Sequence, residues 1–169
     1  MIAILHCDRE WGIGRGNRLM FSLPADMKFF RETTTGHVVV MGANTLRSLP
    51  GGNPLKGRIN LVLDPEGTAR DDCLVLHSLP ELLQKIGEYP ADEVYVIGGA
   101  MMYRTLLPYC EKVLVTKVDA VGGADTFFPD LDADPHFVCE EISEPTETGG
   151  YTIRFCTYRN LAPKSPDEV

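Results

Sequence analysis

The feature that most constrains the fold is a series of short, continuously apolar runs separated by segments with helical spacing. Strands that are apolar at successive positions fit a sheet that is covered on both faces. Helices between consecutive strands favour parallel connections. We therefore expect an α/β fold of one domain, with a mostly parallel central sheet and helices on both faces. The expected strands are 2–7, 38–41, 59–63, 73–76, 94–97 and 112–118.

The segments between these runs predict the helices. Pro24 suits the first position of a helix that Gly36 ends, and the other expected helices are 43–48, 79–87 and 100–108. Beyond Pro129, FVCEEI and YTIRFCTY flank the polar turn E-P-T-E-T-G-G, which predicts an antiparallel pair that ends the sheet. We expect a domain over 1–161 and a polar C-terminal tail over 162–169.

Charge and composition exclude several classes of function. Twenty-four acidic and sixteen basic residues give a net charge of −8, which argues against a nucleic-acid binder. The chain lacks an apolar run of ~20 residues, and its N-terminus lacks the basic region of a signal peptide. Five scattered cysteines without a C-x-x-C pair predict reduced, mostly buried thiols. We expect a cytoplasmic protein that binds neither membranes nor nucleic acid.

Asp26 is the first candidate for chemistry. It falls in the first turn of a helix, beside Met27 and four residues before Phe30, so one helix face presents a carboxylate next to an aromatic ring. A carboxylate in that setting suits bidentate hydrogen bonding to an amidine-like heterocycle edge. The structural alternative is an acid that only complements the helix dipole.

Two strand–glycine–helix junctions suit phosphate binding. Gly98-Gly99 lies between VYVI and AMMYRTLL, and Gly42 precedes Asn44 and Thr45 after VVVM. Ordinary tight turns explain each junction alone equally well, but two of them on parallel strands indicate a dinucleotide. The spacing is not that of the Rossmann fingerprint, and P-loop and zinc-binding patterns are missing.

Two further polar residues stand out. Arg58 precedes the run 59–63 and could clamp a carboxylate with its planar guanidinium, although a solvated loop arginine is the simpler interpretation. Thr116 lies within VLVTKV, where a hydroxyl is ordinary strand composition.

Taken in order, the motifs resemble the dihydrofolate reductase family over roughly 1–159. The matching segments are W-G-I-G-R-G-N-R-L, L-P-A-D-M-K-F-F-R-E-T-T, V-V-M-G-x-N-T, P-L-x-G-R-x-N-x-V-L, Y-V-I-G-G-A-x-x-Y, and V-T-x-V-D followed by A-D-T-F-F-P-D. The resemblance implies reduction of 7,8-dihydrofolate by a reduced nicotinamide nucleotide, dihydrofolate and antifolates as small-molecule ligands, and a monomer.

The resemblance also implies residue roles. Asp26 is expected to be the single active-site acid, supported by Thr116, with Arg58 on the glutamate α-carboxylate, the loop 8–23 as a mobile lid, and a cis peptide at Gly98-Gly99. Residues expected to contact substrate are Ile2, Met27, Phe30, Leu49, Leu55, Arg58, Ile97, Tyr103 and Thr116. Residues expected to contact the nucleotide are Ile4, Ile13, Gly14, Gly42, Ala43, Asn44, Thr45, Leu63, Asp64, His77, Ile97, Gly98, Gly99, Ala100, Met101, Met102, Tyr103 and Thr126. No metal ligand is expected.

The sequence departs from the family at the site expected for the 2′-phosphate of NADPH. Ala43 replaces a basic residue, and Asp64-Pro65 replaces a serine or threonine. We therefore expect NADPH as the cofactor, with NADH also possible, and Arg47 as a substitute contact. Met20-Phe21 also replaces a Pro-Trp pair. The alternative functions are a pyrimidine reductase of riboflavin biosynthesis, which shares the fold, and a catalytically silent binding relative.

Overall fold

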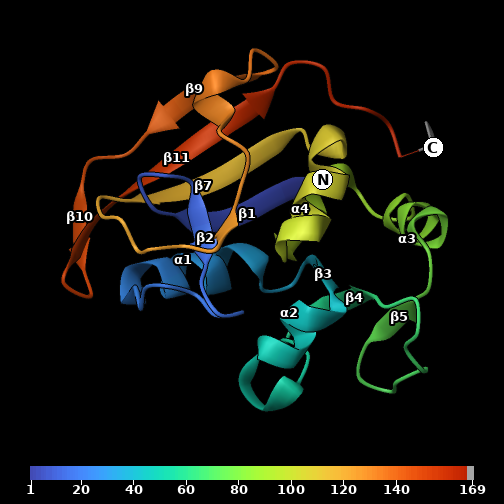
Figure 1. The fold of residues 1–169 in the computed structure, drawn as a ribbon. Coiled ribbons are helices and arrows are strands. Elements are labelled where there is room, and N and C mark those ends of the chain that lie inside the picture. The colour runs from blue at the N-terminus through green and yellow to red at the C-terminus, as the bar shows by residue number, and fades with distance from the viewer. Residues whose placement is uncertain (167–169) are drawn as a thin grey trace.

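The computed structural model describes residues 1–166. Its helices are α1 (Pro24–Thr34), α2 (Ala43–Ser48), α3 (Leu79–Ile86) and α4 (Ala100–Leu106), with 3₁₀ turns at Pro50–Gly52, Ala91–Glu93, Leu107–Tyr109 and Leu131–Ala133. Its strands are β1 (Ile2–Cys7), β2 (Gly12–Gly14), β3 (Val38–Gly42), β4 (Ile59–Leu63), β5 (Leu74–Leu76), β6 (Val94–Gly98), β7 (Lys112–Val118), β8 (Thr126–Phe127), β9 (Phe137–Ile142), β10 (Thr146–Thr148) and β11 (Tyr151–Asn160). Figure 1 shows these elements in chain order by colour.

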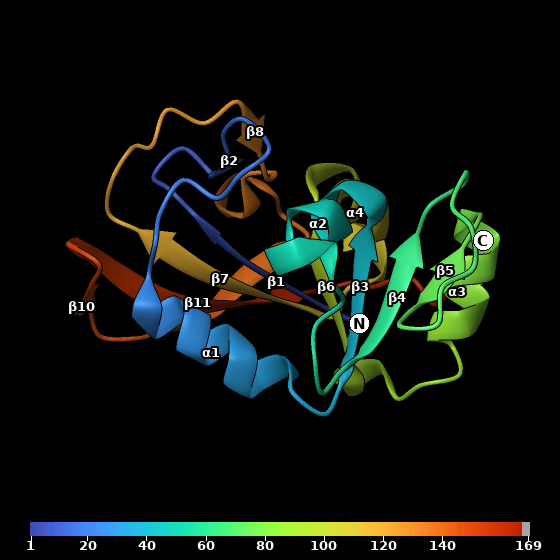
Figure 2. The same cartoon turned by 90° about the horizontal axis from the view of Figure 1, so that it is seen from below.

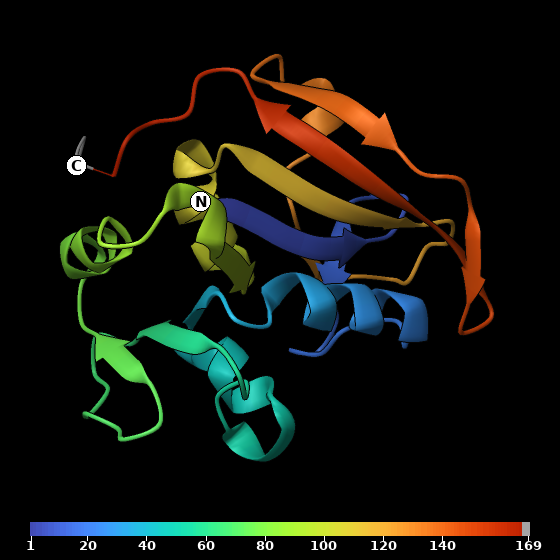
Figure 3. The same cartoon turned by 180° about the vertical axis from the view of Figure 1, so that it is seen from behind.

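The main sheet has the strand order β10-β11-β7-β1-β6-β3-β4-β5. Parallel pairing runs from β7 through β1, β6, β3 and β4 to β5, and β11 pairs antiparallel with β7. The outer edge of the long β11 pairs with β9 near its C-terminal end and with β10 near its start (Figure 3). The expected mixed α/β fold with a mostly parallel sheet and an antiparallel C-terminal strand is confirmed.

The two faces of the sheet bury separate apolar clusters. One contains Ile2 and Ile4 of β1 with side chains from α1 and α2, and the other contains Ala3 and Leu5 with side chains from α3 and α4. Successive strand residues point to opposite faces, so β1 supplies both clusters. Figure 2 shows α1 and α2 against the sheet, with β2 and β8 beyond the end of β1.

Local sequence signals explain where α1 begins and ends. Pro24 occupies its first turn, where a missing N–H costs nothing, and Asp26 in the same turn complements the helix dipole. The helix ends before Gly36, whose φ of 83° is easily reached only without a side chain. The expected boundary at Gly36 thus agrees with the structure.

Several expected boundaries were wrong. The polar turn 144–150 contains a strand, β10, because Thr148 pairs with Tyr151 across a glycine hairpin. Cys73 lies outside β5, which begins at Leu74, and the loop 8–23 contains β2, which pairs with β8. In the expected tail, the amide of Lys164 donates to the carbonyl of Pro108, whereas 167–169 lie outside the described residues. No helix of the described chain is long and apolar enough to cross a membrane.

Candidate active site

The carboxylate of Asp26 is held from two strands. Thr116 of β7 donates its hydroxyl to Oδ1 at 2.6 Å, and Nδ1 of His6 on β1 lies 3.1 Å from Oδ2. Helix α1 carries the acid on the sheet face that it covers, and only 14 % of the Asp26 side chain is exposed. The carboxylate is therefore fixed in orientation before any ligand arrives.

Apolar side chains border this carboxylate. Phe30 follows it by one turn of α1, and the cluster on this face of the sheet includes most of the residues expected to contact substrate, namely Ile2, Phe30, Leu49, Leu55 and Ile97. Met27 is 62 % exposed and lies at the surface of α1. The fold thus brings together residues from β1, α1, the 49–55 loop and β6.

Arg58 occupies the loop at the other end of these side chains. Its guanidinium lies 6.0 Å from the centre of the Phe30 ring, and its Nη2 is 3.5 Å from the Thr35 hydroxyl. Its Nε is buried without a hydrogen-bond partner among residues 1–166. Burial, followed by the nearby charge of Arg31, lowers the pKa of Arg58. A carboxylate ligand would satisfy both the free N–H and the excess positive charge.

Asn60 fixes the loop that carries Arg58. Its side-chain amide donates to the carbonyls of Leu55 at 2.9 Å and Arg58 at 3.1 Å, and its oxygen accepts from the Leu55 amide at 3.0 Å. Sequence reasoning missed this buried asparagine. Its place inside the apolar run 59–63 was the available signal, because a buried amide needs partners.

The residues expected to contact the nucleotide gather at the carboxyl ends of parallel strands. Open α/β sheets bind ligands at this edge. Residues 42–45 follow β3, and 98–103 follow the adjacent β6, with Met41 opposite Gly98. Leu63 and Asp64 end β4, and the Asp64 amide donates to the carbonyl of Leu76 beside His77. Ile13, Gly14 and Thr126 lie in the β2–β8 pair.

The glycine junctions fit a diphosphate. The Gly98-Gly99 peptide is cis, as the resemblance implies. A Cβ on Gly98 would stand 3.3 Å from the Thr45 hydroxyl, so only glycine leaves backbone exposed in this cradle. Helices α2 and α4 both begin here without a side-chain cap, which leaves their first N–H groups available to an anion.

Tyr103 and Met102 belong partly to the core. The Tyr103 hydroxyl donates to the carbonyl of Ile4 at 2.8 Å, and burial, with the charge of Asp26, raises the pKa of Tyr103. The Met102 side chain is buried and packs against Gly42, whereas Met101 is 78 % exposed. Met102 can therefore meet a nucleotide only through its backbone.

Arg47 pairs with Asp64, the acid expected at the site of the NADPH 2′-phosphate. Its Nη2 lies 4.0 Å from Oδ2 of Asp64, and its Nη1 donates to Oδ1 of Asn44 at 2.7 Å. Ala43 adds no charge. Nε2 of His77, which was expected to contact the nucleotide, lies 2.8 Å from the carbonyl oxygen of Gly67. Among residues 1–166, no group of three His, Cys, Asp or Glu side chains could hold a metal.

Two carboxylates hold the loop 8–23, which the resemblance implies is a lid. Asp8 accepts from the amides of Gly12 at 2.8 Å and Gly122 at 2.9 Å. Asp125 accepts from the Gly16 amide at 2.9 Å, while its own amide donates to the carbonyl of Gly14. The loop 8–23 thus lies in one defined position against the segment 120–126.

Comparisons with known proteins agree with this arrangement. The family model described as dihydrofolate reductase matches residues 1–160. The chain belongs to the dihydrofolate reductase family. It is 34 % identical to the dihydrofolate reductase of Bacillus subtilis, over 86 % of either chain, and 31 % identical to that of Haemophilus influenzae, over 85 % of this chain and 88 % of the other. The solved dihydrofolate reductase of Enterococcus faecalis, complexed with NADP(H) and RAB-propyl, superposes with a TM-score of 0.81 at 32 % identity, covering 94 % of this chain and 95 % of that one.

Proposed function

We propose that this chain catalyses the reaction of its family, reduction of 7,8-dihydrofolate to 5,6,7,8-tetrahydrofolate with a reduced nicotinamide nucleotide. The observation that carries the proposal is the Asp26 carboxylate, fixed by Thr116 and bordered by Phe30, with a partly unsatisfied Arg58 at the other end of the apolar surface. That order of anion, apolar wall and cation suits a pterin that carries a glutamate tail. A ribosyl-pyrimidine has no such carboxylate tail.

The residues divide the work of binding and proton supply. Asp26 accepts from N3 and the 2-amino group of the pterin, the apolar side chains around Phe30 hold the rings, and Arg58 binds the α-carboxylate. The backbone around Gly42, Gly98 and Gly99 holds the nucleotide, which supplies the hydride when bound. The lid 8–23 excludes bulk water, and Asp26 orients the water that protonates N5.

Replacing Asp26 tests this assignment. Asp26→Asn keeps the shape and loses the charge, so we expect hydride transfer at pH 7 to slow by roughly 10²–10⁴-fold with the fold retained. Single-turnover kinetics with dihydrofolate measure the rate, and circular dichroism checks the fold. Glu32→Gln is the matched control, because Glu32 is an exposed acid on the same helix. Near-normal turnover in Asp26→Asn would remove Asp26 from the mechanism.

We also infer that NADPH is the cofactor, with a smaller advantage over NADH than a basic residue at position 43 would give. Ala43 supplies no charge, Asp64 repels a phosphate, and Pro65 has no N–H to donate. Each missing charge-assisted contact weakens binding by ~1.5–3 kcal/mol, or roughly ten- to a hundredfold. Arg47, which now neighbours Asp64, is the one nearby cation of α2 that can compensate.

The ratio of kcat/KM for the two nucleotides measures this preference. We expect Ala43→Arg to raise the ratio in favour of NADPH, and Arg47→Ala to lower it, at low salt. Arg104→Ala is the control, because Arg104 is an exposed cation in the last turn of α4 rather than of α2. A strong preference for NADPH in the unmodified enzyme that Ala43→Arg leaves unchanged would contradict the proposal.

The remaining proposals concern partners and location. The ligands are small molecules, dihydrofolate and antifolates such as methotrexate, and the enzyme acts as a cytoplasmic monomer. The net charge of −8 and the apolar cluster that β1, α1, the 49–55 loop and β6 of one chain form support this view.

A further inference from the structure

His6 is a buried polar residue whose place in the reaction the roles above leave open. Residues 2, 4 and 6 of β1 share the face that α1 covers, and His6 pairs directly with Thr116 of β7 in the parallel ladder. The same two cross-strand neighbours contact Asp26, one on each carboxylate oxygen. Only 6 % of the His6 side chain is exposed.

The second ring nitrogen of His6 decides which tautomer the site holds. Nε2 is buried and has no hydrogen-bond partner among the described residues. The Phe21 ring, 6.2 Å from the imidazole, offers no polar atom. A doubly protonated ring carries a proton on Nε2, and so does a neutral ring that accepts at Nδ1. Either state would bury an unpaired Nε2–H, which is costly. A neutral ring that donates from Nδ1 to the carboxylate leaves only a lone pair unpaired.

The acceptor positions of the Asp26 carboxylate show what the contact with His6 does. An ionised carboxylate offers about four acceptor positions, two on each oxygen. Thr116 takes one position on Oδ1 and His6 takes one on Oδ2. One acceptor position then remains on each oxygen. That pair is what two parallel N–H donors of an amidine-like edge require.

We propose that His6 is a positioning residue for Asp26: as the neutral Nδ1–H tautomer it fixes the carboxylate plane so that both oxygens face the pterin edge. This inference rests on the proposed function. Asparagine places an amide N–H near the position of Nδ1, whereas leucine fills similar space without a donor. The two substitutions therefore separate hydrogen bonding from packing.

The test compares His6→Asn with His6→Leu in the full-length enzyme. We expect His6→Leu to weaken methotrexate binding and to slow single-turnover hydride transfer by roughly tenfold or more, the loss of one hydrogen bond to a charged group. We expect His6→Asn to recover most of both losses, whereas KM for the nucleotide stays unchanged in both variants. Equal losses in the two variants, or no loss in His6→Leu, would overturn the proposal.

A spectroscopic measurement keeps the proposal testable even if His6→Leu fails to fold. Long-range ¹⁵N–¹H correlation spectra of the unmodified protein at pH 7 report each imidazole tautomer, and His6→Asn assigns the His6 signal. We expect that Nδ1 of His6 is protonated and that Nε2 is unprotonated. The opposite tautomer would overturn the proposal. Turnover of dihydrofolate by the unmodified enzyme is measured separately, so failure of the proposed function is distinguishable from failure of the His6 role.

Discussion

Arg58 combines a buried Nε–H that has no hydrogen-bond partner among residues 1–166 with a pKa lowered by burial and by Arg31. Both features favour the binding of an anion by this guanidinium. We expect Arg58→Ala to weaken dihydrofolate binding by ~1.5–3 kcal/mol, the value of a hydrogen bond to a charged group. A lipophilic inhibitor without a glutamate tail should lose little affinity. Calorimetric titration of both ligands measures the difference, and Lys28→Ala on the exposed side of α1 is the control. Equal weakening of the two ligands would show that Arg58 shapes the pocket instead.

At the scale of elements, the lid depends on segments far from it in sequence. Asp125 accepts from Gly16 and from its neighbour Thr126, and these hydrogen bonds lower the pKa of Asp125. We expect Asp125→Ala to release the lid, slowing hydride transfer severalfold and weakening the nucleotide more than dihydrofolate. Because the carboxylate is the acceptor, hydrogen exchange at the Gly16 amide should accelerate in the variant.

Asp119→Ala is the matched control for the lid. Asp119 is also exposed, and its carboxylate pairs with the side chain of Arg9 at the start of the same loop. In the described chain it accepts no hydrogen bond from a backbone amide of that loop. Stopped-flow single turnovers of the two variants should therefore differ. Similar rates in both would mean that loop charge, and not the Gly16 contact, controls the lid.

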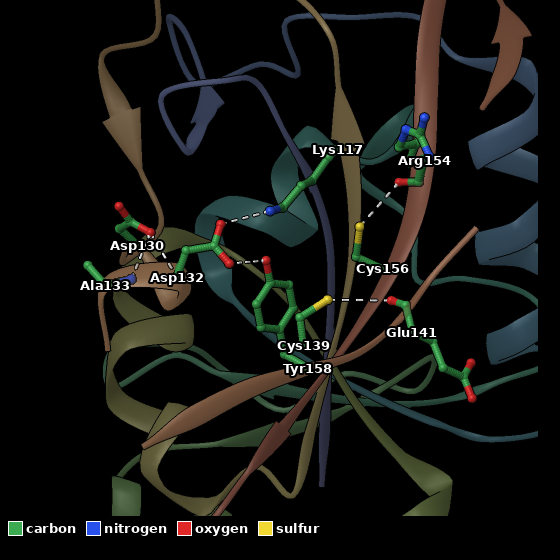
Figure 4. A network of polar contacts seen from close by, with 9 residues as sticks. All are labelled: Lys117, Asp130, Asp132, Ala133, Cys139, Glu141, Arg154, Cys156 and Tyr158. Atoms are coloured by element: carbon green, nitrogen blue, oxygen red, sulfur yellow. Dashed lines mark hydrogen bonds and ion pairs between the residues drawn. The ribbon is translucent and has the colours of Figure 1, made fainter. Parts of the chain in front are cut away.

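At the scale of the whole molecule, one polar network links β7, the 3₁₀ turn at Leu131–Ala133 and β11 (Figure 4). Asp132 accepts from Tyr158 of β11 at 2.6 Å and pairs with Lys117 of β7 at 2.9 Å, and the ammonium lies 5.1 Å from the Trp11 ring. Burial penalises the charge on Asp132, but the Tyr158 and Lys117 contacts outweigh it and hold the pKa of Asp132 below 3.8. The network thus favours the ionised acid in the folded state.

This shift predicts the direction of the pH dependence of stability. A carboxyl whose pKa is lower in the folded state stabilises the fold above its unfolded pKa, and that contribution disappears as pH falls through the folded value. We expect Asp132→Asn to lower Tm at pH 7, and the difference from the unmodified protein to shrink below about pH 3.8. Thermal unfolding at pH 7 and below about pH 3.8 measures this difference in Tm, with Glu144→Gln as an exposed control. A constant difference in Tm across that range would contradict the ionic role.

Much of the architecture follows from local pattern. The apolar runs 2–7, 59–63 and 112–118 have the observed bounds of β1, β4 and β7, because a strand covered on both faces needs apolar residues at successive positions. The runs 38–41, 73–76 and 94–97 differ from the observed strands by one residue. The strand β10 inside a polar turn escaped this reasoning, because edge strands need little apolar character. Asp26, Arg58 and both glycine junctions were singled out because each combines an unusual residue type with a position near an element end.

The sequence by itself determined the kinds of residue available and the elements that carry them, through periodicities that act over a few positions. Only the tertiary structure decided which of these meet. His6, Asp26 and Thr116 lie on three elements, and their contact exists because β1 and β7 are adjacent and α1 packs on their shared face. Arg47 reaches Asp64 because β3 and β4 are neighbours. Strand order is set by packing of the whole chain, and so no local pattern specifies these pairs.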